Sequence, residues 1–421
     1  MGQRNIVVVG GGLAGLCCAR TIQRAGHVAH IYEASDGIGG RVRTDIQDGF
    51  LLDRGFQVLF TAYPAIRQEM DLDALALRPF APGALVCWNK KRYTIADPLR
   101  VPLKAVETAL TPLFSLQDKL NVARLTLLLK SKSVKQIFAL PDQTMDKFLR
   151  DFGFSAAFID RFIRPFYAGI YLEKELATSA RMFAFLFKML AEGQTVVPEA
   201  GMGAIPQQFA DTMLPDTIHL NSPVSALIQR KGRVIGITLN DGRKVKADAV
   251  VMATEFDTAA QLSGLNLPAT WRVSNDISFA LPEPIHHEKL VTLFAETCGL
   301  VNNTAMISNI APSYAPEGWH LLSATVLGET SLSDAELAQT VKTEIGAQFP
   351  AAQPDTWQLL RVYRIRRAQF AQPVGIWDKL PDALTPLPGL ILAGEITVQS
   401  SLHGALVSGQ RAAGLALSIN L

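Results

Sequence analysis

The sequence predicts an α/β fold in which a Rossmann-like nucleotide-binding domain is interleaved with a second, α+β domain. Three stretches support this prediction. Residues 5–34 have the pattern strand, glycine turn, helix, strand; residues 218–253 return to strand-forming sequence; residues 389–417 follow the order strand, polar loop, small-residue helix. Because the first and last stretches both suit a nucleotide site, we expect the two domains to alternate along the chain.

Composition excludes several classes of protein. The chain has 421 residues, of which 48% are hydrophobic and 19% charged, with a net charge of +2. This fits a globular protein of two domains, without the basic bias of nucleic-acid binding. No uncharged apolar stretch reaches the roughly 18 residues of a membrane span, and no signal peptide pattern occurs. We expect a cytoplasmic protein with no nucleic-acid partner and, at most, peripheral contact with a membrane.

The four cysteines show no metal-binding or redox spacing. Cys17, Cys18, Cys87 and Cys298 form no C-x-x-C pair. We therefore expect reduced thiols and no metal site.

The first stretch predicts a dinucleotide-binding turn. A strand at 5–9 leads into Gly10, Gly12 and Gly15, which match the pattern G-x-G-x-x-G, and a helix is expected over 13–25. The first glycine permits the tight turn, the second lets the backbone approach a pyrophosphate, and the third lets the helix pack closely on the strand.

An acidic residue and a second glycine pair follow this turn. Glu33 ends the next strand, where a carboxylate can accept hydrogen bonds from ribose hydroxyls. Gly39, Gly40 and Arg41 come next and could bring a second backbone loop and a cation to the same pyrophosphate. These residues predict dinucleotide binding and leave the choice between NAD and FAD open.

Together these motifs resemble the signature of the flavin-containing amine oxidoreductase superfamily, which includes amine and polyamine oxidases, protoporphyrinogen oxidases and phytoene desaturase-like enzymes. Segments 49–58, 198–210, 221–237 and 393–413 are similar to further family motifs. The resemblance implies non-covalent FAD in a GR2-type domain, held by Gly10, Gly12, Leu13, Ala14, Gly15, Glu33, Gly40, Arg41, Gly55, Phe56, Gln57, Val224, Gly394, Glu395, Leu402 and His403.

The resemblance also implies roles for these residues. Glu33 would bind the adenosine ribose, Arg41 the pyrophosphate region and the Val224 backbone the adenine. Residues 55–57 would lie beside the flavin ring, and Glu395 near the ribityl and phosphate groups.

At the C-terminal end, a helix beginning near Leu402 would direct its N-terminal amides at the flavin pyrimidine, where a positive dipole end stabilises the anionic reduced flavin. His403 would act either as a catalytic group or as a backbone contact.

The expected division of the chain follows from the same matches. FAD-binding segments cover 1–70, 200–255 and 365–421. A mainly helical part of the substrate domain covers 71–199, and its second part covers 256–364.

The chain departs from the amine oxidases in its expected substrate site. The stretch 273–284 contains no lysine, where those enzymes carry one near the flavin, and Ser400 or Ser401 occupies one position of their aromatic pair. Phe370 would fill the other position. These differences count against an amine substrate.

An apolar pocket is expected instead. Residues 162–190 resemble a segment of protoporphyrinogen oxidases and desaturases and are rich in Phe, Tyr and Met. Tyr167, Tyr171 and Phe370 are the candidate pocket residues.

Residues 116–140 predict an amphipathic helix. Leu116, Leu120, Ala123, Leu127, Val134 and Phe138 form an apolar face, and Lys119, Arg124, Lys130, Lys132 and Lys135 lie opposite. This pattern suits either a membrane-surface helix beside a lipophilic channel or an ordinary helix packed in the second domain.

The preferred function is an FAD-dependent oxidoreductase that removes hydride from, or desaturates, a small and mainly apolar substrate, terpenoid- or tetrapyrrole-like. Electrons would pass to oxygen, a quinone or another acceptor. The alternatives are an amine or polyamine oxidase, a flavin-dependent isomerase without net redox change, and a non-enzymatic FAD- or NAD-binding module. No catalytic residue is assigned.

Overall fold

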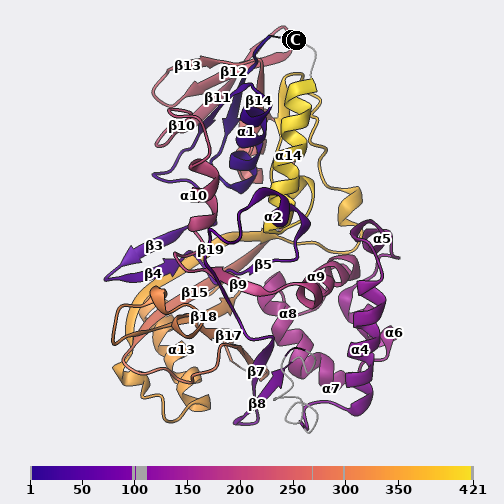
Figure 1. The fold of residues 1–421 in the computed structure, drawn as a ribbon, viewed down its shortest axis with the longest axis vertical. Coiled ribbons are helices and arrows are strands. Elements are labelled where there is room, and N and C mark those ends of the chain that lie inside the picture. The colour runs from indigo at the N-terminus through magenta and orange to yellow at the C-terminus, as the bar shows by residue number, and fades with distance from the viewer. Residues whose placement is uncertain (1, 97–99, 101–110, 268, 297–298, 419–421) are drawn as a thin grey trace.

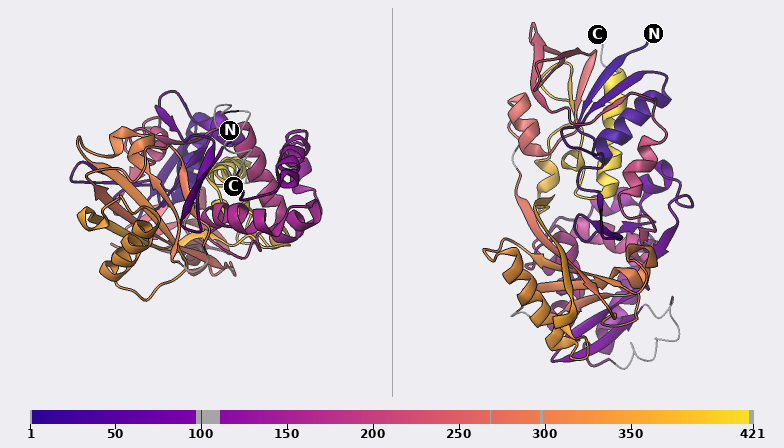
Figure 2. Two further views of the ribbon diagram at one scale, coloured as in Figure 1. Left: turned by 90° about the horizontal axis from the view of Figure 1, so that it is seen from below. Right: turned by 90° about the vertical axis from the view of Figure 1, so that its left-hand side faces the viewer.

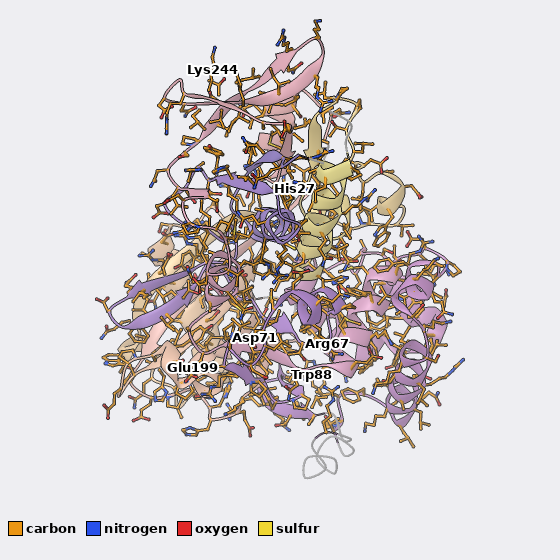
Figure 3. The ribbon with its side chains drawn as sticks, turned by 45° about the horizontal axis from the view of Figure 1, so that its top comes forward. His27, Arg67, Asp71, Trp88, Glu199 and Lys244 are labelled. Atoms are coloured by element: carbon orange, nitrogen blue, oxygen red, sulfur yellow. The ribbon has the colours of Figure 1, made fainter. Side chains whose placement is uncertain are left out.

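The protein is built from two halves (Figure 1). The computed structural model describes residues 2–96, 100, 111–267, 269–296 and 299–418. One half contains a parallel sheet, and we call it the parallel-sheet half. The other, the mixed-sheet half, contains a seven-stranded sheet on one side and a group of helices on the other, as Figure 2 also shows. In Figure 3, Lys244 marks a hairpin at the far end of the first half and Trp88 lies in the second.

Five strands from distant parts of the sequence form the parallel sheet. Their order is β10-β2-β1-β14-β20, and every neighbouring pair is parallel. Ile6 of β1 lies opposite Ala249 of β14, so the N-terminal strand pairs with one from the middle of the chain. The strands are β1 Asn5–Val9, β2 Val28–Tyr32, β10 Ile218–His219, β14 Ala249–Met252 and β20 Leu390–Leu392.

Both faces of this sheet are covered, which explains the unbroken apolar runs of its strands. α1 (Leu13–Arg24) and α14 (Leu402–Ser418) cover one face. The other is covered by α11 (Phe256–Ser263) and by a three-stranded antiparallel sheet of β11 (Val224–Arg230), β12 (Arg233–Leu239) and β13 (Lys244–Lys246).

α1 and α14 approach each other closely. A Cβ added at Gly409 of α14 would lie 2.5 Å from the Ala14 carbonyl oxygen and 2.9 Å from the Cys17 Cβ. Glycine is therefore required for this contact, which places the middle of α14 against the first turns of α1.

Two long antiparallel strands, β15 (Trp271–Leu281) and β19 (Gln358–Phe370), connect the halves. Trp271 and Phe370 pair at one end and pack with the core of the parallel-sheet half, whereas Ile277 and Phe279 belong to the core under α13 (Asp334–Gln348). The mixed sheet has the order β19-β15-β18-β17-β16-β7-β8, its other strands being β7 Gly83–Trp88, β8 Lys91–Ala96, β16 Val291–Phe294, β17 Val301–Met306 and β18 His320–Leu327.

The helical group of the mixed-sheet half surrounds α9, whose Phe183 and Phe185 are fully buried. The group consists of α4 Leu116–Lys130, α5 Val134–Phe138, α6 Met145–Phe152, α7 Ala156–Phe158, the π-helix η2 Ile159–Ile163, α8 Arg164–Tyr171 and α9 Ala180–Glu192. The remaining elements are β3 Thr44–Gln47, β4 Phe50–Asp53, β5 Leu59–Phe60, α2 Pro64–Glu69, β6 Leu77–Pro79, β9 Thr195–Pro198, α10 Ala204–Ala210, α12 Ile307–Ile310, η3 Pro312–Tyr314, η4 Pro354–Thr356, η5 Ile376–Asp378 and η6 Glu395–Thr397.

The α/β, Rossmann-like fold class is confirmed, and so are its first elements. The strand, glycine turn, helix and strand of residues 5–34 form β1, α1 and β2. The apolar run at 249–252 rejoins the parallel sheet as predicted.

The predicted helix over 116–140 is wrong in two respects. The chain leaves the helix after Lys130 and begins α5 at Val134, with Ser133 accepting a hydrogen bond from the Gln136 backbone N–H. The predicted apolar face also points outward, because Leu116 and Leu127 are 71% and 72% exposed.

Buried polar residues explain this orientation. Asp118 accepts hydrogen bonds from the backbone and hydroxyl of both Ser115 and Ser155, and Asn121 donates to the Gly153 carbonyl at 2.8 Å. These bonds hold the polar side of α4 against the α6–α7 connection, together with Leu125 and Leu129.

Cys17, Cys18 and Cys87 are free and buried, and burial raises the pKa of the Cys17 and Cys87 thiols to about 12. Cys298 lies outside the described residues. Within the described ranges, no helix combines the length and the apolar composition needed to cross a membrane.

The contact between α1 and α14 can be tested by substitution. Gly409→Val is expected to lower the free energy of unfolding by about 1–3 kcal/mol, because the new side chain meets the backbone of α1. Gly414→Val, on the same helix with nothing within 4 Å of its Cβ, is the control and should change stability by about 0.5 kcal/mol or less. Equal effects of the two substitutions in urea unfolding would contradict this account.

Candidate functional site

A cavity of about 2220 Å³ lies between the two halves. A pocket for one small ligand usually measures roughly 300–1,000 Å³, so this cavity has room for a dinucleotide and a second molecule. Most residues predicted from the sequence line it, namely Gly10, Gly12, Leu13, Ala14, Glu33, Gly40, Arg41, Gly55, Phe56, Gln57, Tyr167, Tyr171, Val224, Gly394, Glu395 and Leu402. Gly15, His403 and Phe370 are not among its lining residues.

Two glycine loops form one end of the cavity. The Gly39 backbone N–H donates to the Gly11 carbonyl at 2.8 Å, and a Cβ added at Gly40 would lie 3.4 Å from the Gly12 Cα. A Cβ at Gly12 would meet nothing within 4 Å, so this position opens onto the cavity. Gly15 packs instead against the Gly10 carbonyl, 2.0 Å from where its Cβ would stand.

The start of α1 leaves its N-terminal amides without a side-chain cap, and its first turn contains no acidic residue. Free amides and the positive end of a helix dipole attract an anion. The two loops and this helix end therefore fit a pyrophosphate, as FAD requires.

Glu33 lies directly after β2 and faces the same end of the cavity. Its Oε2 accepts a hydrogen bond from the Gly11 N–H at 2.6 Å, and its Oε1 accepts from the Ser35 N–H and hydroxyl at 2.8 and 2.7 Å. A carboxylate offers about four acceptor positions, so Glu33 keeps capacity for a ribose hydroxyl while it braces the glycine turn.

Arg41 and Glu395 form an ion pair at the middle of the cavity. Arg41 Nη2 lies 2.7 Å from Glu395 Oε1, and Arg41 Nη1 donates to the Ala368 carbonyl at 2.7 Å. Burial by itself lowers the pKa of Arg41, but the charge and the hydrogen bond of Glu395, together with the Glu255 charge, outweigh it and raise the pKa overall. Ser400 donates its hydroxyl to Glu395 Oε2 at 3.0 Å, so residues from both ends of the chain hold this pair.

Residues 55–57 cross the cavity wall with a constrained backbone. Gly55 has a φ of +98°, a backbone conformation that favours glycine, and a Cβ there would lie 2.5 Å from the Ile365 Cδ1, which would have to move. The Gln57 side chain donates to the carbonyls of Arg41 and Arg54, at 2.8 and 3.0 Å. Gln57 thus ties this segment to the Arg41 loop.

α14 begins at the cavity with Leu402, but the His403 ring points away from it. Its Nδ1 accepts a hydrogen bond from the Ala65 N–H at 3.3 Å, and its ring stacks on Tyr63 with centroids 5.6 Å apart. Burial lowers the pKa of His403 to about 4, so the ring is neutral near pH 7. This placement favours a structural role over a catalytic one.

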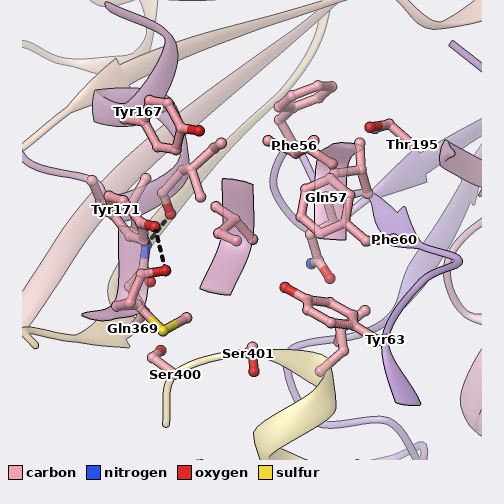
Figure 4. A pocket seen from close by; sticks show the side chains of 18 of the residues that line it. Phe56, Gln57, Phe60, Tyr63, Tyr167, Tyr171, Thr195, Gln369, Ser400 and Ser401 are labelled. Carbon is pink, nitrogen blue, oxygen red and sulfur yellow. Dashed lines mark hydrogen bonds between the residues drawn. The ribbon is translucent and has the colours of Figure 1, made fainter. Parts of the chain in front are cut away.

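The other end of the cavity is lined mainly by aromatic and aliphatic side chains (Figure 4). Tyr167 and Tyr171 come from α8, and Phe183 from α9. The Tyr171 hydroxyl donates to the Met182 carbonyl at 3.2 Å. Charged side chains of the described lining include Arg41 and Glu395 near the glycine loops, Lys130 on α4, Glu192 on α9 and Arg100, which donates to the Gly193 carbonyl.

The placement of Phe370 corrects the prediction that it lines the substrate pocket. Phe370 is buried in the core of the parallel-sheet half, edge-on to Phe256 with centroids 5.9 Å apart. Side chains alternate along a strand, and it is the preceding residue of β19, Gln369, that faces the cavity. Gln369 and Tyr63 were missed because only the register of β19 and the fold of residues 59–64 reveal that they face inward.

Two buried carboxylates link the halves beside residues 55–57. Asp53, at the end of β4, accepts hydrogen bonds from the Met202 N–H and the Tyr314 hydroxyl, both at 2.9 Å. Asp276 of β15 accepts from the Ser323 hydroxyl at 2.7 Å and from the Phe56 N–H. Burial raises the pKa of Asp53 to about 6, and burial together with the Asp53 charge raises that of Asp276 to about 7.

These pKa values predict how stability depends on pH. Both carboxyls titrate higher in the folded chain than unfolded, so the native state binds more protons, and the free energy of unfolding falls as pH rises from about 4 to about 7. In Asp276→Asn the side chain at this position cannot ionise. The decrease in its free energy of unfolding between pH 5 and pH 8 should therefore be smaller than that of the parent by roughly 1–3 kcal/mol.

Exposed Asp355 provides the control for this measurement by urea unfolding. Asp355→Asn should keep the parental pH dependence. An unchanged pH dependence in Asp276→Asn would contradict the buried-carboxyl account.

Comparison with known proteins places this geometry in a family. The sequence profile of the flavin containing amine oxidoreductases matches residues 13–417. A 15-cis-phytoene desaturase of Glycine max is 23% identical over 460 residues, covering 96% of this chain and 78% of the relative. Protoporphyrinogen oxidase 2 of Arabidopsis thaliana is 29% identical over 169 residues, a match that spans only 39% of this chain and 32% of that relative.

The fold agrees with these matches. The crystal structure of a putative protoporphyrinogen oxidase from Exiguobacterium sp. 255-15 covers 99% of each chain with a TM-score of 0.76 at 21% identity. Such a likeness shows the fold alone. With the family match across nearly the whole chain, it leads to one conclusion: the protein belongs to the flavin-containing amine oxidoreductase family and is an FAD-dependent oxidoreductase.

Proposed function

We propose that the protein removes hydride from carbon in, or desaturates, a mainly apolar substrate of terpenoid or tetrapyrrole type. The observation that carries this proposal is the aromatic and aliphatic end of the cavity between α8, α9 and residues 55–57. A large apolar pocket of this kind binds its ligand by burying hydrocarbon surface.

The lysine expected of amine oxidases has no counterpart on β15. Residues 273–284 contain no lysine, and the buried acidic residue of that strand, Asp276, is held by Ser323 and the Phe56 backbone. An amine substrate therefore has less support than an apolar one.

Residues of this chain would hold the cofactor and the substrate in fixed positions relative to each other. The glycine loops and the start of α1 would hold the pyrophosphate, Glu33 the ribose, and Arg41 and Glu395 the central part of the molecule. When bound, FAD accepts a hydride from the substrate carbon. Residues 55–57 would support the flavin ring so that the substrate lies directly against it, and the aromatic walls would exclude water.

Anaerobic mixing tests the proposal. FAD-loaded protein is mixed with a polyene, a reduced tetrapyrrole or putrescine, and the flavin absorbance and the substrate mass are followed. The proposal expects bleaching by one of the first two, with loss of two hydrogens. Bleaching by putrescine alone would identify an amine oxidase instead, and a product of unchanged mass formed only with reduced FAD would identify an isomerase.

The cofactor end yields a sharper prediction. Gly12→Val places a side chain in open space, so the fold should persist while the pyrophosphate loses its backbone cradle. FAD affinity should fall by about tenfold or more, measured by fluorescence titration with the apoprotein. Gly414→Val, also in open space but on the outside of α14, is the matched control. Equal FAD affinity in the two variants would contradict the assignment.

We also propose that the substrate enters from an anionic membrane surface along α4. Leu120 and Leu128 are 57% and 41% exposed, beside Leu116 and Leu127, which line the cavity. The only acidic residue in 116–138, Asp118, is buried, whereas basic residues flank the leucines: Lys119, Arg124, Lys130, Lys132 and Lys135. Exposed apolar side chains with a basic border suit a bilayer of anionic lipids.

Vesicle binding tests this surface. Leu120→Ser/Leu128→Ser should weaken binding to vesicles containing phosphatidylglycerol by about tenfold or more, since it removes two leucines from the lipid contact. Leu214→Ser, an exposed leucine after α10, should not. Binding that is equal for all three proteins, or equally strong to vesicles of phosphatidylcholine alone, would contradict the proposal.

A further inference from the structure

Two tyrosine hydroxyls face the cavity without a partner. Tyr63 and Tyr167 are only 4% and 3% exposed, and both line the cavity. In Figure 4 their hydroxyls point inward from opposite sides. Among the described residues neither hydroxyl has a hydrogen-bond partner, and burial alone raises the pKa of both phenols, so they remain protonated donors.

Tyr171, a neighbouring tyrosine of the cavity wall, does have a hydrogen-bond partner for its hydroxyl. Tyr171 lies one helical turn from Tyr167 and stacks on it with centroids 5.8 Å apart. Its hydroxyl donates to the Met182 carbonyl at 3.2 Å, so it has a partner within the protein. The fold thus provides a hydrogen-bond partner for the Tyr171 hydroxyl and none, among the described residues, for the Tyr167 hydroxyl.

Gln369 adds an acceptor to the same space. Its Nε2 donates to the Ile170 carbonyl at 2.7 Å, which fixes the amide and leaves Oε1 without a donor in the described part of the chain. The bond to Ile170, which precedes Tyr171 in α8, positions this acceptor on the same side of the cavity as α8. An amide oxygen can only accept, so its complement is an N–H or O–H group.

A bare hydrocarbon would leave all three groups buried and unpaired. Water that solvates these groups before the ligand binds would be displaced without replacement, and each unpaired group weakens binding. A site that hydrogen-bonds its ligand rejects analogues lacking the group by large factors for this reason.

We propose that the substrate is a lipophilic molecule bearing neutral hydrogen-bonding groups, with at least one N–H or O–H donor, which pair with Tyr167, Gln369 and Tyr63. This inference rests on the proposed function, because it concerns the substrate of the same site. It favours an apolar molecule that contains nitrogen or oxygen over a pure polyene hydrocarbon as the substrate.

Two probes of equal shape test the inference by binding alone. Carbazole carries one N–H donor, and fluorene has a CH₂ group in its place. Dissociation constants for the FAD-loaded protein are measured from the change in the flavin spectrum. We expect carbazole to bind about tenfold more tightly than fluorene, the difference made by one buried hydrogen bond.

Matched variants assign the preference to the cavity groups. Gln369→Leu removes the acceptor for the carbazole N–H, and it should reduce the preference for carbazole by about tenfold. Tyr171→Phe removes a hydroxyl that is already paired within the protein and should retain the preference, with thermal unfolding confirming that both variants fold.

Equal binding of both probes, binding of neither, or an unchanged preference in Gln369→Leu would overturn the inference. Reduction of bound FAD by a pure hydrocarbon polyene would also overturn it while leaving the proposed function standing. If no lipophilic compound reduces the FAD but the carbazole preference holds, the proposed function fails and the inference about the cavity does not.

Discussion

The close approach of two glycine loops is the contact on which the rest of the site depends. Gly39 donates to the Gly11 carbonyl, and Gly40 faces Gly12 across a space that no side chain enters. This contact brings Arg41 to the cavity, where Glu395 from the far end of the sequence neutralises it. Backbone N–H groups and the positive end of α1 thus form a site for a large anionic cofactor before any ligand arrives.

The relative position of the two halves is fixed by contacts next to this site. β15 and β19 run from one core to the other, and the carboxylates of Asp53 and Asp276 accept hydrogen bonds across the boundary beside residues 55–57. The segment that would lie beside the flavin ring is therefore anchored from both sides. An oxidoreductase needs this precision, because hydride transfer depends strongly on the distance and alignment of the two reacting centres.

Local patterns carried much of the prediction, and long-range packing decided what they missed. The glycine spacing and the strand ending before Glu33 are local, so the turn and its acidic residue could be recognised from sequence. Periodicity could not show that α4 buries Asp118 and exposes Leu127, because the partners of Asp118 include Ser155 on another element. The prediction that Phe370 faces the cavity was wrong by one residue along β19, and a shift of one residue moves a side chain to the opposite face of a strand. The division into domains and the roles of the cofactor-binding residues remain predictions.

A crystal structure of the FAD-loaded protein with an apolar ligand is the most direct test of the account. It should show the pyrophosphate between Gly12 and Gly40, the isoalloxazine ring beside residues 55–57, and the ligand between that ring and Tyr167. A cofactor bound elsewhere, or an isoalloxazine ring occupying the aromatic end around Tyr167 with no space for a substrate, would contradict it.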